Sequence, residues 1–367
     1  MKKRVAVLGA TGSVGRSAVD VLRGEKDRLL PVLFTAGKNA EELRKLKEEF
    51  PGVSTALADN GLLEAIAAAA ADITVNCIAG AAGLLPSEAV IKSGSDLALA
   101  NKETIVMAGR IIFDLASENN VRIIPVDSEH SAIFRLMAAH GKENVSEIIL
   151  TASGGPFRNF SVEALSRVTP AEALAHPTWN MGPKITVDSA TLANKGLEVI
   201  EAAGLFGFPP EKIKVTVHPQ SIVHSMVRLK NGAVYAQMSK PDMRLPIHEA
   251  LLWPETEYSP YGVLDFDSLS LTFEKPDTER FPMLSLAYET LNGGPYLPVA
   301  YNAANEIAVD AFLKGDAGFL EIPRIVGYVL EKVSSMEKTA DSSIKSVLAM
   351  DLEARNMTGR IIGGRKC

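Results

Sequence analysis

The chain begins with an apolar run that leads directly into a glycine-rich turn. Lys2–Leu8 has the composition of a β-strand, Gly9–Gly15 reads Gly-Ala-Thr-Gly-Ser-Val-Gly, and a helical pattern continues to about Arg23. Closely spaced glycines let a backbone approach a pyrophosphate, and the helix N-terminus that follows supplies amide donors and a positive dipole. This order of strand, glycine turn of the GxxGxxG variant and helix predicts a dinucleotide-binding site. The alternative is a tight turn with only a structural role.

Apolar runs separated by helical stretches continue to residue 127. The candidate strands are Arg4–Leu8, Leu30–Thr35, Thr55–Ala58, Ile73–Ile78, Asp96–Ala100 and Val121–Val126. Such alternation is typical of a parallel sheet with helices on both faces. We therefore expect residues 1–127 to form a Rossmann-like, doubly wound α/β domain that binds a nucleotide.

The residues after the second candidate strand carry a cation. An NAD site usually has Asp or Glu at this place, where the acid binds the ribose hydroxyls. The sequence here contains Lys38 and no acid, which favours the 2′-phosphate of NADP; the alternative is that Lys38 is a solvated residue at a helix start. Together with the glycine turn, the predicted cofactor contacts are Thr11, Gly12, Ser13, Val14, Gly37, Lys38 and Asn39.

From Val145 onward the regular alternation ends. The candidate strands are Ser146–Leu150, Ile213–Val217, Ile222–Leu229 and Ala233–Met238, the last two joined by a hairpin signal at Lys230-Asn231-Gly232. Ser153–Lys184 is predicted as a long loop, and a loop of that length in a compact enzyme is usually a lid or binding segment. We expect residues 128–255 to form an α+β domain with a flap at about 153–186.

The remainder of the chain is predicted to be helical. Prolines mark residues 253–280 as irregular, and we expect a linker at 256–280. Helical periodicity follows at 282–292, 299–314, 321–333 and about 341–357, so residues 281–367 are predicted to form a C-terminal helical bundle.

A polar stripe carries the clearest candidate chemistry. The segment Val187–Glu201 is predicted as one helix that begins at Asp188 or Ser189. Polar residues recur on one face of that helix, namely Asn194, Lys195, Glu198 and Glu201. An ammonium and a carboxamide suit an anion such as phosphate, and a carboxylate one turn away suits a hard cation. The alternative is an exposed polar face without a ligand.

Two further acids, Asp127 and Glu129, follow the last candidate strand of the first domain. With Glu198 they supply carboxylate oxygens that fit Mg²⁺ or Mn²⁺, with Co²⁺ as a third candidate. The alternative is N-capping of a helix that starts at Ser131, which accounts for one acid but not for both acids and Glu198.

Composition excludes several classes of protein. A net charge of −6 gives no basic footprint for nucleic acid, and no apolar stretch is long enough for a transmembrane helix. The two cysteines, Cys77 and Cys367, form neither a disulfide framework nor a zinc motif, so a reducing compartment is expected. Neither a signal peptide nor a plastid transit peptide is recognisable, which favours a bacterial cytoplasm.

Strings along the chain agree with one family. They are GATGSVG from Gly9, AGKN from Ala36, ALANKE from Ala98, PVDSEHSAIF from Pro125, TASGGPF from Thr151, HPTWNMGPKITVDSATLANKGLEVIEA from His176, HPQSIVHSMV from His218, KPDMRLPI from Lys240 and NAANEIAVDAFL from Asn302. On these strings the chain resembles the 1-deoxy-D-xylulose 5-phosphate reductoisomerases. The resemblance implies that NADPH and a divalent metal support isomerisation and reduction of 1-deoxy-D-xylulose 5-phosphate to 2-C-methyl-D-erythritol 4-phosphate, in isoprenoid precursor biosynthesis. It also implies a V-shaped homodimer, with dimerisation through residues 128–255.

The resemblance assigns roles to individual residues. It implies metal binding by Asp127, Glu129 and Glu198, and phosphate contacts from Ser153, Ser189, Asn194 and Lys195. The other implied substrate contacts are Lys102, Ser128, Glu129, His176, Trp179 and Glu198. The implied nicotinamide-side contacts are Asn101, Glu103, Gly182 and Met243. The catalytic set is Lys102, Glu129, Glu198, His176 and His224, with either histidine as the proton-transferring group.

Structural roles remain open for several of these residues. Ser189 could be a plain N-cap, and Lys102 and Glu103 an ordinary pair at a helix start. Trp179 could anchor a loop, His224 could be a buried structural residue, and Met243 could belong to a helix core. Asn302, Asn305 and Glu306 are expected to cap or pair helices.

Other functions are weighed against this one. A semialdehyde dehydrogenase would need a nucleophilic cysteine in its catalytic domain, where this chain has none, since Cys77 lies in the nucleotide domain. A nucleotide-sensing regulator would keep the glycine turn but would need neither the acids nor the phosphate contacts. A family relative acting on another sugar phosphate remains a further alternative.

Overall fold

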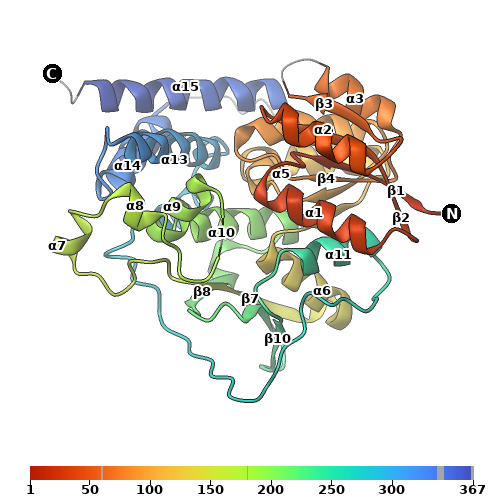
Figure 1. Cartoon of the computed structure of the whole chain (residues 1–367). Coiled ribbons are helices and arrows are strands. Elements are labelled where there is room, and N and C mark those ends of the chain that lie inside the picture. The colour runs from red at the N-terminus through yellow and green to blue at the C-terminus, as the bar shows by residue number, and fades with distance from the viewer. Residues whose placement is uncertain (59–60, 180, 337–342, 365–367) are drawn as a thin grey trace. The chain divides into compact units, whose positions relative to one another are not determined.

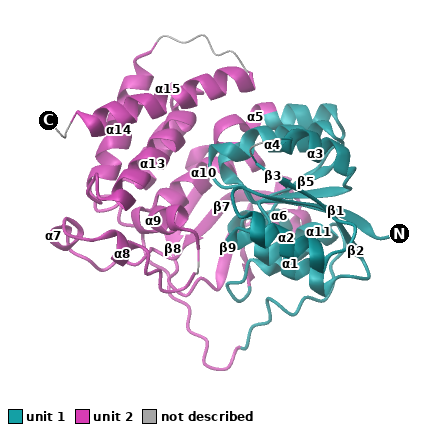
Figure 2. Ribbon diagram, turned by 45° about the horizontal axis from the view of Figure 1, so that its top comes forward, with its two compact units in different colours: residues 1–104, 112–135, 239–265 teal, residues 105–111, 136–238, 266–367 magenta. Residues whose placement is uncertain are grey.

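A computed structural model describes residues 1–58, 61–179, 181–336 and 343–364 (Figure 1). Cys367 and the start of the helix predicted from residue 341 lie outside the described residues. The chain divides into two compact units, each built from three separate segments (Figure 2). Unit 1 comprises residues 1–104, 112–135 and 239–265, and unit 2 comprises residues 105–111, 136–238 and 266–367.

Unit 1 contains a parallel sheet with the strand order β3-β2-β1-β4-β5-β6. Its strands are β1 Lys3–Leu8, β2 Leu29–Ala36, β3 Ser54–Leu57, β4 Ile73–Asn76, β5 Asp96–Leu99 and β6 Ile123–Pro125. The order reverses between β1 and β4, which is the switch point at which doubly wound sheets bind ligands. The prediction of a Rossmann-like α/β fold is confirmed.

Helices cover both faces of this sheet (Figure 2). Those within unit 1 are α1 Ser13–Gly24, α2 Ala40–Glu49, α3 Leu62–Ala69, α4 Leu84–Lys92 and α11 Arg244–Leu252, with a 3₁₀ turn η1 at Ala81–Gly83. α1 packs against α11 on one face, and α3 packs against α4 on the other. One apolar core therefore joins Val7 and Leu22 with Ile247 and Leu251, although these pairs lie far apart in the sequence.

Two longer helices contribute residues to both units. They are α5 Lys102–Glu118 and α6 Ser128–His140. α5 bends at Ala108, whose φ of −141° lies outside the helical range.

Unit 2 contains a mixed sheet with the order β10-β9-β7-β8. Its strands are β7 Val145–Ala152, β8 Ile213–Val217, β9 Val223–Leu229 and β10 Val234–Met238. β7 pairs with β8 in parallel and with β9 antiparallel, and β9 pairs antiparallel with β10. The predicted hairpin is confirmed; Gly232 in its turn has φ +90°, a conformation that favours glycine.

Helices make up most of the rest of unit 2. They are α7 Val162–Leu165, α8 Pro170–Ala173, α9 Pro183–Thr191, α10 Ala193–Phe206, α12 Met283–Leu291, α13 Leu297–Lys314, α14 Glu321–Ser334 and α15 Ile344–Gly363, with 3₁₀ turns η2 Lys142–Asn144 and η3 Pro210–Lys212. α13, α14 and α15 pack on one another, as expected for a C-terminal helical bundle. The segment predicted as one long loop, Ser153–Lys184, is not wholly irregular, because α7, α8 and the start of α9 lie within it.

The prediction of one helix over Val187–Glu201 is wrong. The structure places two helices there, because Leu192 adopts a left-handed conformation with φ +61° and separates α9 from α10. Asp188 and Ser189 therefore lie in the last turn of α9, and neither is an N-cap. A left-handed leucine is costly and has no sequence signal comparable to glycine or proline.

Between α11 and α12 the described chain is largely irregular, apart from an isolated bridge between Val217 and Glu274. Residues 239–265 pack with unit 1 and residues 266 onward with unit 2. The domain division at residues 127, 255 and 280 stays a prediction. None of the described helices is both long and apolar enough to cross a bilayer.

Candidate active site

The glycine turn after β1 is held against the end of β2. Thr35 Oγ1 accepts a hydrogen bond from the Gly9 amide at 3.0 Å, and the Thr35 carbonyl accepts one from the Ala10 amide at 2.7 Å. Gly9 has φ +77°. A Cβ on Gly15 would lie 2.1 Å from the Gly9 carbonyl oxygen, so no other residue fits there. The turn is thus a tight backbone cradle in front of a helix N-terminus.

The predicted cofactor contacts of unit 1 lie in this cradle or at the end of β2. Gly12 is the N-cap of α1 and Ser13 its first residue; both are exposed. Thr11 and Val14 are half-buried. The residues after β2, Gly37, Lys38 and Asn39, are exposed, and Asn39 caps α2 by accepting a hydrogen bond from the Glu42 amide at 3.1 Å.

Asn101 has a structural role at the end of β5. It caps α5 by accepting from the Thr104 amide at 3.0 Å, and its Nδ2 donates to the carbonyls of Ile78 and Gly80 at 2.7 and 2.9 Å. Nδ2 also lies 3.0 Å from Glu103 Oε2. The side chain therefore ties the loop after β4 to the start of α5.

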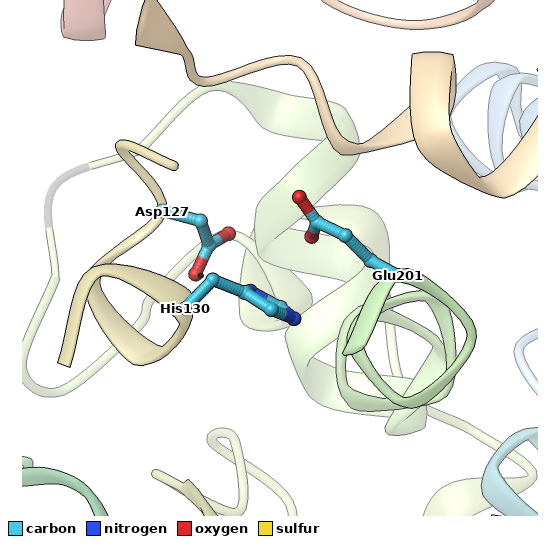
Figure 3. A group of neighbouring side chains, drawn as sticks. All are labelled: Asp127, His130 and Glu201. Carbon is cyan, nitrogen blue, oxygen red and sulfur yellow. Dashed lines mark ion pairs between the residues drawn. The ribbon is translucent and has the colours of Figure 1, made fainter. Parts of the chain in front are cut away.

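Lys102 and Asp127 form a buried ion pair in unit 1. Lys102 Nζ lies 2.6 Å from Asp127 Oδ2. His130 Nδ1 lies 3.5 Å from Asp127 Oδ1, and Figure 3 shows these two side chains. Burial alone would raise the pKa of the Asp127 carboxyl, but the neighbouring Lys102 and His130 hold it well below its usual range. Asp127 is therefore ionised at neutral pH. Figure 3 also draws Glu201, a residue of α10 in unit 2.

The start of α6 brings Asp127, Ser128 and Glu129 together. α6 begins at Ser128 rather than at Ser131. Ser128 Oγ donates to Glu129 Oε2 at 2.5 Å, and the Glu129 amide donates to Asp127 Oδ1 at 3.3 Å. Carboxylate oxygens of Asp127 and Glu129 lie within 4.8 Å of one another, a spacing suited to one cation.

Ser153, His176 and Ser189 form a compact cluster in unit 2. His176 Nε2 lies 3.0 Å from Ser153 Oγ and 3.1 Å from Ser189 Oγ, and the two hydroxyl oxygens are 3.3 Å apart. His176 Nδ1 accepts hydrogen bonds from the Thr178 and Trp179 amides at 3.1 and 3.0 Å. Burial lowers the pKa of His176. The neutral ring therefore carries its proton on Nε2 and donates toward the serines.

Gly155 brings the segment after β7 against α9. Gly155 has φ +68°, and a Cβ there would lie 2.6 Å from the Ser189 carbonyl oxygen and 2.8 Å from Ala190 Cα. Only glycine allows Ser153, two residues earlier, to sit this close to Ser189.

Trp179 and His224 meet in unit 2. Their ring centroids are 6.4 Å apart in an edge-to-face arrangement, and His224 on β9 is 5% exposed. Gly182, the N-cap of α9, follows in the same segment, where its carbonyl accepts from Thr186 Oγ1 at 2.8 Å.

The polar residues of α10 are mutually bonded. Asn194 Nδ2 donates to Glu198 Oε1 at 2.5 Å, and the Lys195 ammonium is paired with Glu198 Oε2. Lys195 is 3% exposed and Glu198 is 1% exposed. The polar stripe is therefore a buried ionic cluster and not the exposed polar face of the alternative interpretation. The helix start predicted at Asp188 or Ser189 lies instead at Ala193, so the positive end of α10 is next to Asn194.

The structure thus assembles three groups of the predicted site residues. Unit 1 groups Lys102, Asp127, Ser128 and Glu129, whereas unit 2 groups Ser153, His176 and Ser189, and separately Asn194, Lys195 and Glu198. Met243, the N-cap of α11, is partly buried against the unit 1 core.

The sequence did not indicate three residues that shape the site, namely Thr35, Gly155 and Leu192. Asn305 was expected to cap or pair helices, but its partner Asp188 was not predicted. Gly155 lies in a Gly-Gly-Pro string that could have signalled a close approach of the backbone. Asn305 Nδ2 donates to Asp188 Oδ1 at 2.8 Å, a contact between segments far apart in the sequence that no local pattern reveals.

Comparisons with known proteins agree along the chain. The model of the 1-deoxy-D-xylulose 5-phosphate reductoisomerase family matches residues 5–60 and 52–109. The model of that enzyme's C-terminal domain matches residues 123–206, and a DXP reductoisomerase C-terminal domain model matches residues 238–357. The reductoisomerase of Geobacter metallireducens is 47% identical over 384 residues, which cover 98% of this chain and 99% of the relative.

Solved reductoisomerase structures are also similar to this chain. The reductoisomerase of Zymomonas mobilis in complex with NADPH has a TM-score of 0.88 and 42% identity, with 99% of each chain covered. A DOX-P reductoisomerase in complex with NADPH, fosmidomycin and magnesium has a TM-score of 0.92 and 34% identity, again with 99% of each chain covered. The chain belongs to the 1-deoxy-D-xylulose 5-phosphate reductoisomerase family.

Proposed function

We propose that the chain catalyses the NADPH- and divalent-metal-dependent isomerisation and reduction of 1-deoxy-D-xylulose 5-phosphate to 2-C-methyl-D-erythritol 4-phosphate, which feeds isoprenoid precursor biosynthesis. The observation that carries the proposal is the similarity to reductoisomerases along 98% of the chain. The groups of polar residues in the two units provide the chemistry that this reaction needs.

The cradle after β1 fits the pyrophosphate of NADPH. A Cβ on Gly15 would collide with the backbone of the turn, so the glycines serve a close backbone approach. We assign Thr11, Gly12, Ser13 and Val14 to this contact, and Gly37, Lys38 and Asn39 to the adenosine 2′-phosphate. Asn101, Glu103, Gly182 and Met243 are our candidates on the nicotinamide side.

The acids fit a hard divalent cation such as Mg²⁺ or Mn²⁺. Asp127 is kept ionised beside Lys102, and Glu129 offers a carboxylate next to it. We assign Glu198 as the third carboxylate. When bound, the cation supplies positive charge that polarises the ketone, and NADPH supplies the hydride. An oxygen-only ligand set favours such ions over zinc or copper.

The unit 2 cluster fits a phosphate dianion. His176 donates toward the oxygens of Ser153 and Ser189, so neither hydroxyl hydrogen is needed for the contact with His176, and the hydroxyls can donate to phosphate oxygens. We assign Asn194 and Lys195 as further phosphate contacts at the positive end of α10.

The remaining residues act on the reacting carbons in this proposal. Lys102 and Ser128 hold substrate hydroxyls, and the Lys102 ammonium stabilises negative charge that develops on oxygen. Trp179 covers the substrate and excludes water. His176 or His224 moves the proton; the Nε2 proton of His176 suits it to donate rather than to accept.

Turnover with and without metal tests the proposed function. Purified protein is mixed with NADPH and 1-deoxy-D-xylulose 5-phosphate, and absorbance at 340 nm is followed with Mg²⁺ or Mn²⁺ and again with EDTA. We expect oxidation only with the metal, because the acids alone cannot polarise the ketone. Absence of oxidation by folded protein that binds NADPH would contradict the named reaction.

Reversing the charge of Lys38 should discriminate between the two nicotinamide cofactors. In Lys38→Glu we expect KM for NADPH to rise by about 100-fold, because a carboxylate replaces the cation that pairs with the 2′-phosphate. KM for NADH should change little. The matched control is Lys47→Glu, an equally exposed charge reversal in the last turn of α2. An equal rise in KM for NADPH and for NADH would contradict the assignment of Lys38 to the 2′-phosphate site.

We further propose that two copies pair through the edge strand β10. β10 ends the sheet of unit 2, and its Val234 and Tyr235 are 43% and 42% exposed. An exposed apolar edge offers unpaired backbone groups to a second strand. Exposed Phe266 and Phe273 add apolar surface in the same unit. Sedimentation equilibrium should give twice 39.3 kDa, and a monomer at micromolar concentration would contradict the dimer.

We also propose that the protein works in a reducing bacterial cytoplasm. Cys77 is a free thiol, and the relatives named above come from bacteria. Activity recovered in the periplasmic fraction of fractionated cells would contradict this location.

A further inference from the structure

The C-terminal helices of unit 2 reach α9 through one buried hydrogen bond. Asn305 Nδ2 on α13 donates to Asp188 Oδ1 on α9 over 2.8 Å. Asn305 is 0% exposed and Asp188 is 1% exposed, so neither can readily exchange this bond for one to water. Hydrogen bonds to ionised carboxylates are among the stronger and more directional polar contacts in proteins.

Asp188 also has a charged partner on its own helix. Lys184, one turn earlier on α9, pairs with Asp188 Oδ2 at 2.8 Å. The pKa of Tyr301 on α13 is raised by burial and by the nearby charge of Asp188. A buried carboxylate needs hydrogen bonds in addition to an ion pair, and Asn305 supplies one from a different helix.

Asn305 lies on a helix that is itself held in place. Arg355 on α15 bonds Glu306, the residue after Asn305, at 2.6 Å, and bonds Asp351 at 2.7 Å. Within the described residues no group donates to Asn305 Oδ1. The bond to Asp188 is the one hydrogen bond that this side chain makes among the described residues. Its loss would leave a second buried polar atom of the carboxamide unsatisfied, which is unfavourable.

Asp188 is the sequence neighbour of Ser189, which belongs to the cluster of Ser153, His176 and Ser189. Ser189 follows it in the last turn of α9, and Ser189 Oγ lies 3.1 Å from His176 Nε2 and 3.3 Å from Ser153 Oγ. α9 ends at Thr191, and α10 begins at Ala193. A shift of Asp188 therefore moves Ser189 away from its neighbours.

We infer that Asn305 is a positioning residue of the phosphate site, because it fixes Asp188 and thereby holds Ser189 against Ser153 and His176. This inference rests on the proposed function, since it takes Ser189 as a phosphate contact. A purely structural Asn305 would lower thermal stability when it is replaced and would leave phosphate affinity unchanged.

The test compares two asparagines on the same helix. Asn305→Ala removes the bond to Asp188. Asn302→Ala is the matched control, because Asn302 is also 0% exposed and donates instead to Glu306 at 3.1 Å and to Met107 Sδ at 3.7 Å. For each protein we would measure Tm, KM for 1-deoxy-D-xylulose 5-phosphate, KM for NADPH, and the inhibition constant of inorganic phosphate against the sugar phosphate.

In Asn305→Ala we expect KM for the sugar phosphate and the inhibition constant of inorganic phosphate to rise together by about tenfold, because a displaced hydroxyl contacts the anion poorly. KM for NADPH should stay constant. Asn302→Ala should lower Tm and leave all three constants unchanged. Unchanged phosphate constants in Asn305→Ala, or equal rises in both variants, would overturn the inference. If Asn305→Ala does not fold, Asn305→Ser serves in its place, because its hydroxyl is too short to reach Asp188.

A second measurement distinguishes failure of the inference from failure of the proposed function. Calorimetric titration of each protein with inorganic phosphate measures the anion site without turnover. If wild type binds phosphate but does not oxidise NADPH, the named reaction fails, and the inference is decided by the affinities of the two variants. Absence of phosphate binding by folded wild type would overturn the inference itself.

Discussion

Glu198→Gln is expected to reduce metal-dependent turnover by on the order of a thousandfold, because it removes the charge of a carboxylate that we propose as a ligand of the cation, which stabilises transition-state charge. Glu198 is 1% exposed and holds the Lys195 ammonium and the Asn194 amide. Glutamine preserves shape and one acceptor but not the charge. NADPH binding should persist, because the cradle in unit 1 is untouched.

Two measurements separate this result from unfolding. NADPH binding is followed by fluorescence, and turnover is titrated with Mn²⁺, whose half-saturating concentration should rise. Glu201→Gln is the informative comparison, because Glu201 lies one turn later on α10 and is equally buried. Normal turnover in Glu198→Gln together with lost metal dependence in Glu201→Gln would show that the ligand is misassigned.

Gly155→Ala should lower kcat/KM for the sugar phosphate by about 100-fold, since a methyl group forces Ser153 and Ser189 apart. Its Cβ would lie 2.6 Å from the Ser189 carbonyl oxygen, and φ +68° is strained for alanine. We expect a loss of unfolding free energy of about 2–5 kcal/mol from strain and overpacking together.

Gly232→Ala measures the cost of a positive φ at alanine without the steric clash that a Cβ at position 155 would make. Gly232 has φ +90° but open space where its Cβ would lie. Chemical denaturation should therefore show a loss of only about 1 kcal/mol, with unchanged kinetics. Gly155→Ala could instead lose as little unfolding free energy as Gly232→Ala and keep the wild-type KM for the sugar phosphate. That result would show that the close approach of β7 to α9 does not affect substrate binding.

The sheet of unit 1 could be predicted because its signals are local. Each strand is a short apolar run, and the glycine turn at Gly9–Gly15 directly follows the first of them. Buried parallel strands require such runs, whatever the rest of the chain does. Asp127, Glu129 and the polar residues of α10 could be named from their chemistry and spacing, whereas the roles of Ser153 and His176 came from strings that resemble one family.

Features that depend on distant contacts could not be predicted. Leu192 adopts a left-handed conformation between α9 and α10 although leucine normally continues a helix. The burial of Lys195 and Glu198 was also missed, because an amphipathic pattern predicts that charges face solvent. Asn305 meets Asp188 across 117 positions, beyond the reach of any periodicity.

The segmented build of unit 1 has a consequence for the order of events during synthesis. Its apolar core includes Ile247, Ala250, Leu251 and Leu252 from α11, in addition to residues of β1 and α1. Domains ordinarily fold from the N-terminus as they leave the ribosome. Here the first strands emerge long before the helix that covers them, a delay on the order of ten seconds at usual elongation rates. Unit 1 therefore completes its core only after all four strands of the β7–β10 sheet have been translated.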